Sequence, residues 1–198
     1  MPISIFLKKT ALCGAVMEHK NFSKSIKKVV LSGPESTGKT FLSQKLATHF
    51  HTVWVEEYGR AYCQTVGQNL TSLDFAHIAG GQIFLEDEAA KKANVVLFCD
   101  TDLIVTEIWA EIYKVECPGW VIEETHRRHY DLFLLLAPDV AWEHDGLREY
   151  PHIRNWHYER LKTELEKRKV PLVIISGDYE SRMRQAVGAV EKMLNASI

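Results

Sequence analysis

The feature that most constrains this chain is the stretch 33–40, which reads G-P-E-S-T-G-K-T. The apolar run Val29-Val30-Leu31 precedes it, and a stretch carrying Leu42 and Leu46 follows it. This order predicts a strand, a glycine loop and a helix, whose backbone N–H groups surround a phosphate chain. We therefore interpret the stretch as a phosphate-binding loop, or P-loop, rather than as a glycine-rich turn without a nucleotide.

The spacing also assigns roles within the loop. Lys39 is expected to reach the β- and γ-phosphates of ATP, and Thr40 is expected to ligate Mg²⁺. ATP and Mg²⁺ are therefore the expected cosubstrate and metal ion. The residues expected to surround the nucleotide here are Gly33, Pro34, Glu35, Ser36, Thr37, Gly38, Lys39, Thr40 and Phe41.

The composition of the chain argues against several other classes of protein. The 198 residues are 46% hydrophobic and carry a formal net charge of −2, so they have material for a substantial core but no general attraction for nucleic acid or anionic membranes. No apolar run is long enough to cross a bilayer. The four cysteines form no C-x-x-C pair, which argues against a zinc site or a disulfide framework. We expect a cytoplasmic protein with a small-molecule partner; its oligomeric state is left open.

The chain divides into an extension and a single domain. Residues 1–27 are basic and lack clear periodicity, so they are expected to be a poorly ordered extension, in which Met17 competes with Met1 as the start. In residues 28–198, helical patterns alternate with five apolar runs, at 29–31, 53–55, 95–100, 131–136 and 172–175. This alternation predicts a three-layer α/β/α sandwich around a five-stranded parallel sheet.

Acidic side chains follow two of these predicted strands. The carboxyl ends of parallel strands face the ligand crevice, so residues there are candidates for substrate contacts. Asp100 is the first candidate for the proton acceptor and for a Mg²⁺ partner, and Glu57 is the competing base. The alternatives are a solvated loop for 56–60 and a simple helix cap for Asp102. The candidates for substrate binding at the two strand ends are Glu56, Glu57, Tyr58, Arg60 and Asp102.

A lid is expected near 142–157, where the chain becomes polar and aromatic before the last strand. Arg148 in this segment is a candidate catalytic residue, because an arginine supplied by a lid neutralises charge on the transferred phosphoryl group. The alternative is that Arg148 is an exposed loop arginine with no catalytic role. With no N-K-x-D guanine-reading sequence and no second motor domain, these features favour a small-molecule kinase. The competing hypothesis is an ATP-binding regulatory protein or ATPase with no small-molecule acceptor.

Five motifs in order also carry a resemblance. They are the P-loop, E-Y-G-R at 57–60, D-T-D at 100–102, D-G-L-R at 145–148 and D-Y-E-S-R at 178–182. Together they resemble the nicotinamide-riboside kinase domain of NadR-type bacterial proteins, a P-loop NTPase of the nucleoside and nucleotide kinase type. The resemblance implies transfer of the ATP γ-phosphate to the 5′-hydroxyl of nicotinamide riboside, giving nicotinamide mononucleotide for NAD synthesis. It also implies that Tyr179 and Arg182 border the adenine, and that Gln82 and Asp102 offer polar contacts to a sugar.

The chain departs from that family where the family places an aromatic clamp on the pyridinium ring. Glu56 stands at the first clamp position and Asp87 at the second. Trp54 is one candidate to replace the aromatic clamp, and the other is attraction of the cationic ring by the carboxylates. Trp109 and Tyr113, which share one face of a predicted helix, are interpreted as packing residues rather than ligand contacts.

A helix is predicted from about 71 to 92, because Thr71-Ser72-Leu73-Asp74 is a capping-box-like start with Asp in place of Glu. The adjacent glycines 80 and 81 interrupt this helix. Because two glycines weaken a helix, they indicate the close approach of another backbone or of a ligand.

Overall fold

The computed structural model describes residues 26–144 and 150–196. Five parallel strands form a sheet in the order β2-β3-β1-β4-β5. The strands are β1 (Lys27–Ser32), β2 (Trp54–Val55), β3 (Val96–Asp100), β4 (Leu132–Leu136) and β5 (Leu172–Ile175). The helices are α1 (Lys39–His49), α2 (Tyr58–Val66), α3 (Ser72–Ala90), α4 (Leu103–Tyr113), α5 (Gly119–Arg127), the short η1 (Pro151–Ile153), α6 (Arg154–Lys167) and α7 (Tyr179–Asn195).

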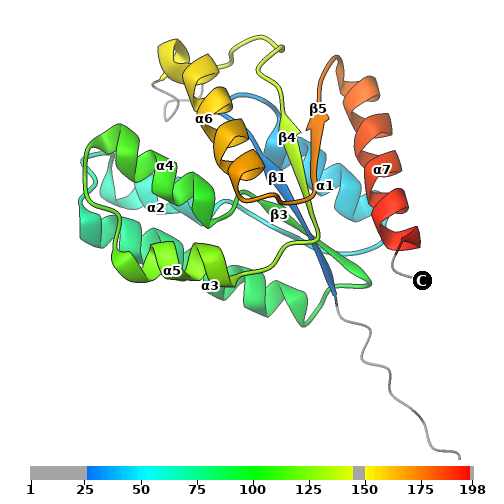
Figure 1. Ribbon diagram of the computed structural model, residues 1–198, viewed down its shortest axis with the longest axis horizontal. Coiled ribbons are helices and arrows are strands. Elements are labelled where there is room, and N and C mark those ends of the chain that lie inside the picture. The colour runs from blue at the N-terminus through cyan, green and yellow to red at the C-terminus, as the bar shows by residue number, and fades with distance from the viewer. Residues whose placement is uncertain (1–25, 145–149, 197–198) are drawn as a thin grey trace, which may run out of the picture.

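Helices cover both faces of the sheet (Figure 1). On one face, Leu46 of α1 and Val190 of α7 pack in a core with Val29 and other β1 residues. On the other face, residues of α4 and α6 pack on the opposite side chains of β1 and β3. Since β1, β3 and β4 are covered on both sides, their sequences are continuous apolar runs rather than alternating ones. The predicted three-layer α/β/α sandwich with a five-stranded parallel sheet is confirmed.

Helix α2 was not predicted, because the motif at 57–60 was interpreted as the end of a strand. Its stability depends on α3, which follows it. The Tyr62 hydroxyl donates to Asp74 Oδ1 at 2.7 Å, and a Cβ on Gly59 would lie 3.3 Å from the Ile78 side chain. These contacts join residues far enough apart in sequence that local propensity does not reveal them.

Helix α3 begins with the predicted capping box, in which Asp74 accepts from the Thr71 backbone N–H at 2.7 Å. The two adjacent glycines of α3 have different surroundings. A Cβ on Gly80 would meet open space, whereas one on Gly81 would lie 2.2 Å from the ring of Tyr58. The partner at Gly81 is thus an aromatic ring of α2, so the expectation of a backbone or a ligand was wrong.

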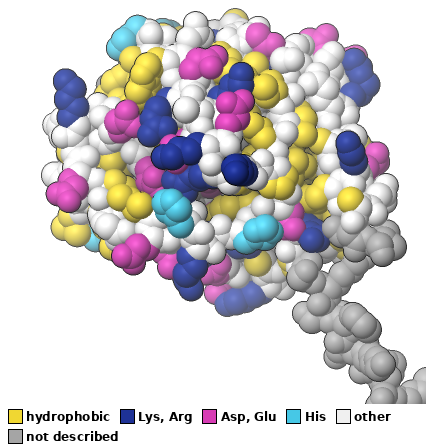
Figure 2. Space-filling view, viewed as in Figure 1, with side chains coloured by type: hydrophobic (Ala, Val, Ile, Leu, Met, Phe, Trp, Pro, Cys, Tyr) yellow, Lys and Arg dark blue, Asp and Glu magenta, His cyan; other side chains and the backbone are white. Residues whose placement is uncertain are grey.

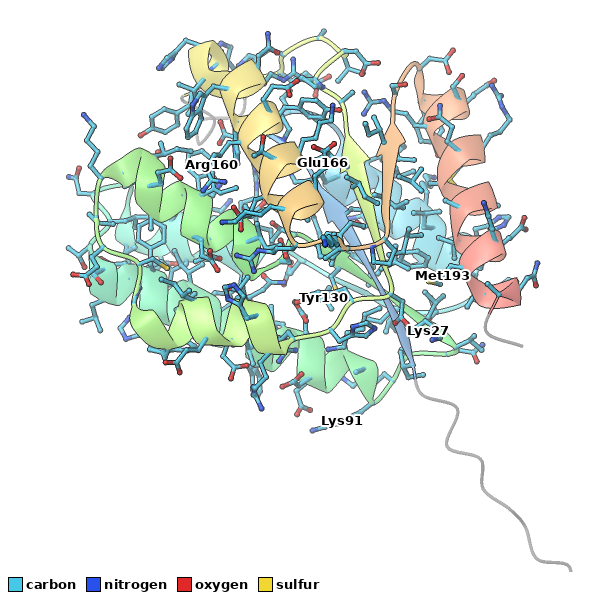
Figure 3. The ribbon with its side chains drawn as sticks, viewed as in Figure 1. Lys27, Lys91, Tyr130, Arg160, Glu166 and Met193 are labelled. Atoms are coloured by element: carbon cyan, nitrogen blue, oxygen red, sulfur yellow. The ribbon has the colours of Figure 1, made fainter. Side chains whose placement is uncertain are left out.

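Ion pairs tie the helices of one face together. Arg160 points from α6 toward α4, where its Nε donates to Glu111 at 3.0 Å (Figure 3). On the face shown in Figure 2, basic and acidic side chains are intermixed. In the described part of the chain, no helix is long and apolar enough to cross a membrane.

Two predictions fall wholly or partly outside the described residues. They are the N-terminal extension, except for its last two residues, and 145–149 of the lid, including Arg148.

Candidate functional site

A cavity of about 610 Å³ lies beside the P-loop. The P-loop and α1 form one wall, and residues of α2, α3 and α4 form the opposite wall. Further lining residues come from the segment after β4, from α6 and from the start of α7. Since the parallel strands β1 and β3 end here, the cavity is where an open α/β sheet binds its ligands.

The backbone of the loop explains its glycines. Gly33 has a φ of 145°, and a Cβ on it would lie 2.8 Å from the carbonyl oxygen of Leu136. Gly38, directly before α1, has a φ of 83°. Both values lie in the region that side chains with a Cβ rarely adopt. The loop therefore needs glycine at positions 33 and 38 in order to fold over a phosphate chain.

Lys39 and Thr40 begin α1 on the cavity side. Lys39 Nζ donates to the carbonyl oxygens of Gly33 and Pro34 at 2.9 and 3.0 Å, across the loop where a phosphate chain is expected. The Thr40 hydroxyl donates to Asp100 Oδ2 at 2.5 Å. The structure thus brings the P-loop lysine, the threonine and the acid of β3 together.

Asp100 is 1% exposed, and burial raises its pKa to about 6 against the opposing effect of Lys39. Its Oδ1 has no hydrogen-bond partner among the described residues. The same residues include no group of three or more His, Cys, Asp or Glu side chains able to hold a metal. Mg²⁺ in phosphoryl-transfer sites is bound by one or two protein oxygens together with phosphates and water, so the Thr40 and Asp100 oxygens fit this ion.

Arg182, predicted to border the adenine, lies 4% exposed in the cavity lining. It donates to the carbonyl oxygens of Gly177, Thr37 and Ala137 at 2.8 to 2.9 Å and pairs with Asp139. The arginine therefore joins the P-loop to the ends of β4 and β5.

Arg154, at the start of α6, holds the loop from the other side. Its guanidinium donates to the backbone oxygens of Ser36, Val140 and Glu35 at 2.7, 2.8 and 3.2 Å. The carbon at its centre lies 5.7 Å from the centroid of the Trp142 ring. Arg154 falls within the expected lid segment as a weaker candidate than Arg148, because a single arginine in a polar segment gives no signal of which carbonyl groups it meets.

Phe41 and Tyr179 form an aromatic pair at the α1 and α7 end of the cavity. Their ring centroids are 4.9 Å apart, and the two side chains are 49% and 44% exposed. Both residues line the cavity and both were predicted nucleotide contacts. Exposed ring faces of this kind suit stacking on a flat base.

On the opposite wall, the structure separates the predicted substrate residues into two groups. Glu57, Arg60 and Gln82 line the cavity. Glu56 is exposed and Tyr58 packs on α3, and neither is among the lining residues.

Asp102 is also outside the lining and is buried at the start of α4. Burial raises the pKa of Asp102 to about 7, and the neighbouring Glu86 adds to this effect.

Gln82 is 2% exposed. Its Oε1 accepts a hydrogen bond from the Tyr58 backbone N–H at 2.9 Å, which fixes the orientation of the amide. Its Nε2 has no partner within the described residues. The side chain therefore presents an unused donor at the cavity wall.

Residues that were predicted to pack in the core, or that carry no signal in the sequence, also line the cavity. Trp109 and Tyr113 do so from α4, with Tyr150 and His157 beside them. His157 is 2% exposed, and burial lowers its pKa to about 3. The spacing of Trp109 and Tyr113 places them on one helix face, but that spacing is the same for a core face and for a cavity wall.

The structure places the two positions of the family's aromatic clamp, Glu56 and Asp87, outside the cavity lining, and Trp54 as well. Asp87 pairs with Arg128 at 2.7 Å on the surface of α3. Trp54 packs against the core between the sheet and α1. Neither of these residues is among those that line the cavity.

Comparisons with known proteins are consistent with this geometry. The model of the AAA domain family matches residues 28–182. The trifunctional NAD biosynthesis/regulator protein NadR of Escherichia coli (strain K12) is 32% identical over 176 residues, which are 85% of this chain and 43% of that relative. The chain thus spans less than half the length of this curated relative.

Two solved structures are similar to the described fold. A NadR protein in complex with NR has a TM-score of 0.74 and 28% identity, covering 86% of this chain and 52% of that one. A NadR protein in complex with NAD and AMP-PNP has a TM-score of 0.70 and 27% identity, covering 86% and 50%.

Proposed function

The chain belongs to the AAA domain family, and we propose that it is an ATP-dependent kinase of nicotinamide riboside. It would transfer the γ-phosphoryl group of ATP to the 5′-hydroxyl of the riboside and release nicotinamide mononucleotide. One observation carries the proposal: the P-loop is only one wall of its cavity, and a second wall with Glu57, Arg60 and Gln82 faces it. A phosphate acceptor fits between the two walls.

The relatives support the choice of acceptor. The similar solved structures include NadR proteins bound to NR and to AMP-PNP, and the curated relative is named for NAD biosynthesis. The competing hypothesis, an ATPase or regulatory protein without an acceptor, needs room only for the nucleotide and water. A cavity walled by α2, α3 and α4 beyond the P-loop gives that hypothesis no support.

Positioning and charge neutralisation supply most of the rate in such a reaction. The loop N–H groups and Lys39 would bind the β- and γ-phosphates, and Thr40 and Asp100 would hold Mg²⁺. When bound, the ion neutralises negative charge on the phosphates. Phe41 and Tyr179 would stack on the adenine. Arg148 lies outside the described residues, and its catalytic role stays a prediction.

Glu57 is the better placed of the two candidate bases. Asp100 is buried, accepts a hydrogen bond from Thr40 and is not among the residues that line the cavity. Glu57 lies in the lining directly before α2. We therefore assign proton acceptance from the substrate hydroxyl to Glu57, and metal binding to Asp100.

The test is incubation of the purified protein with MgATP and a mixture of nucleosides that includes nicotinamide riboside, followed by mass spectrometry. We expect nicotinamide mononucleotide with the wild type and none above background with Lys39→Ala, with the fold of the variant checked by circular dichroism. Phosphorylation of a different nucleoside would support the kinase activity and refute nicotinamide riboside as the acceptor. ATP hydrolysis that no nucleoside changes would favour the competing hypothesis.

A further inference from the structure

The cavity contains a second aromatic group, distant in sequence from the Phe41 and Tyr179 pair. Trp109 and Tyr113 lie one turn apart on α4, with ring centroids 6.2 Å apart. Tyr150, just before η1, packs against both, at 5.6 Å from Trp109 and 6.2 Å from Tyr113. All three residues line the cavity and are partly exposed. We call these three residues the aromatic wall.

On α4, the residues beside the aromatic wall that face the cavity are uncharged. The other residues that α4 contributes to the cavity are Val105 and Thr106. The ring of His157 lies 5.1 Å from that of Trp109 at an angle of 79°, and burial keeps this histidine neutral by lowering its pKa to about 3. Ring faces in such a site attract cations through their quadrupole, and the attraction strengthens as water is excluded.

Gln82 gives an independent indication of a ligand on this side. It is almost fully buried, its Oε1 is already engaged by Tyr58, and its Nε2 has no partner among the described residues. A buried donor left unpaired is costly, so the site is built for a ligand that brings a hydrogen-bond acceptor.

We infer that the aromatic wall binds the flat cationic ring of the phosphate acceptor and selects it by charge, with Gln82 Nε2 donating to an oxygen of the same molecule. This inference rests on the proposed function, since the pyridinium of nicotinamide riboside is such a ring. The wall takes the place of the residues predicted from the sequence for this role. Glu56 is exposed, and Asp87 is paired with Arg128.

The first experiment compares nicotinamide riboside with its neutral 1,4-dihydro form, which keeps the sugar and the hydroxyl. For Trp109→Leu we expect the KM for the cationic riboside to rise about tenfold or more, a change of roughly 1.4 kcal/mol. The KM for the neutral form should change less, and the KM for ATP should stay as in the wild type. Trp109→Tyr, which keeps a ring face, should recover most of the loss.

Two further variants complete this experiment. Trp120→Leu is the matched control, because Trp120 is exposed on α5 and is not among the residues that line the cavity. Tyr150→Leu, outside the buried core clusters, repeats the test if Trp109→Leu does not fold. Equal losses for the cationic and neutral forms, or no loss in either variant, would overturn the inference.

The second experiment does not depend on turnover. Titration with 1-methylnicotinamide should quench the tryptophan fluorescence of the wild type in a saturable way, and Trp109→Leu should abolish the saturable part. If wild-type protein phosphorylates no riboside but shows this quenching, the proposed function is refuted, whereas the binding of a cationic ring by the aromatic wall is supported. If wild-type protein makes nicotinamide mononucleotide while the Trp109 and Tyr150 variants match it in both experiments, the inference about the aromatic wall is refuted and the kinase activity is supported.

Discussion

Glu56 and Glu57 are adjacent in sequence but lie in different surroundings. Glu57 lines the cavity directly before α2, whereas Glu56 is exposed to solvent. At the residue scale, a shift of one position therefore decides which of the two carboxylates a ligand in the cavity is able to meet.

We predict that Glu57→Gln lowers kcat by a factor of about 10² to 10⁴, the usual contribution of a general base. Glu56→Gln is the comparison, and it should keep kcat within about threefold of the wild type, because surface substitutions generally have small effects. Steady-state kinetics with MgATP and nicotinamide riboside measures both. An unchanged kcat in Glu57→Gln would return the role of the base to Asp100.

His157 gives a prediction for the dependence of stability on pH. Burial lowers its pKa from 6.5 to about 3, so between these values the unfolded chain binds a proton that the folded protein does not. The stability that this histidine contributes is complete above about pH 6.5 and is lost as the pH falls toward 3. Between pH 7.5 and pH 5 the loss amounts to about 2 kcal/mol.

His157→Phe, which keeps a ring beside Trp109, should remove most of this loss. The free energy of unfolding from urea titrations at the two pH values measures it. His49→Phe, at an exposed position of α1, is the control and should leave the difference between the two pH values as in the wild type. A His157→Phe protein that loses as much stability on acidification as the wild type would refute the assignment.

At the element scale, the opposite wall of the cavity depends on how α2 sits on α3. The Tyr58 ring lies over Gly81, and the Tyr58 N–H holds the Gln82 amide at 2.9 Å. Contact between these helices thus orients the side chain with the unused donor. The same contact explains why α3 has a glycine in its middle despite the cost to the helix.

We predict opposite effects from two neighbouring substitutions in α3. Gly80→Ala should raise the free energy of unfolding by about 0.5 to 1 kcal/mol, because its Cβ meets open space and alanine favours the helix. Gly81→Ala should lower it by about 1 to 3 kcal/mol, because the Cβ would lie 2.2 Å from the Tyr58 ring. It should also raise the KM for the riboside. Urea unfolding and kinetics measure the two effects; stabilisation by both substitutions would contradict the described packing.

At the scale of the whole molecule, two arginines hold the P-loop to distant parts of the chain, the buried Arg182 and the partly buried Arg154. Arg182 on α7 links the loop to the segments after β4 and β5, and Arg154 links it to α6. Binding of the phosphates therefore depends on segments more than 100 residues beyond the P-loop.

We predict that Arg182→Lys lowers the free energy of unfolding by about 2 to 4 kcal/mol, because an ammonium group cannot reach all the oxygens that the guanidinium bonds. Arg184→Lys is the matched control on the same helix. Its side chain is 70% exposed, so we expect a change of less than about 0.5 kcal/mol. Equal effects in the two variants, measured by urea unfolding, would show that the buried contacts do not stabilise the fold.

Much of the fold follows from patterns that are local in sequence. The continuous apolar runs predicted the strands to within about two residues, since a strand covered on both faces needs apolar side chains throughout. The P-loop was predicted because its glycines, lysine and threonine are consecutive, and their backbone geometry depends mainly on one another. The capping box of α3 was predicted for the same reason. Helix α2 was not, because its stability comes from contacts with α3.

The sequence by itself therefore determined the α/β class, the P-loop and the acid that Thr40 meets, because each is set by neighbouring residues or by the common edge where parallel strands end. Only the tertiary structure decided which residues form the cavity wall opposite the P-loop. It brings Gln82, Trp109, Tyr150 and His157 together from α3, α4, the segment before η1, and α6. A helix face that packs in a core and one that lines a cavity have the same spacing of apolar residues, and only the packing of the other elements distinguishes them.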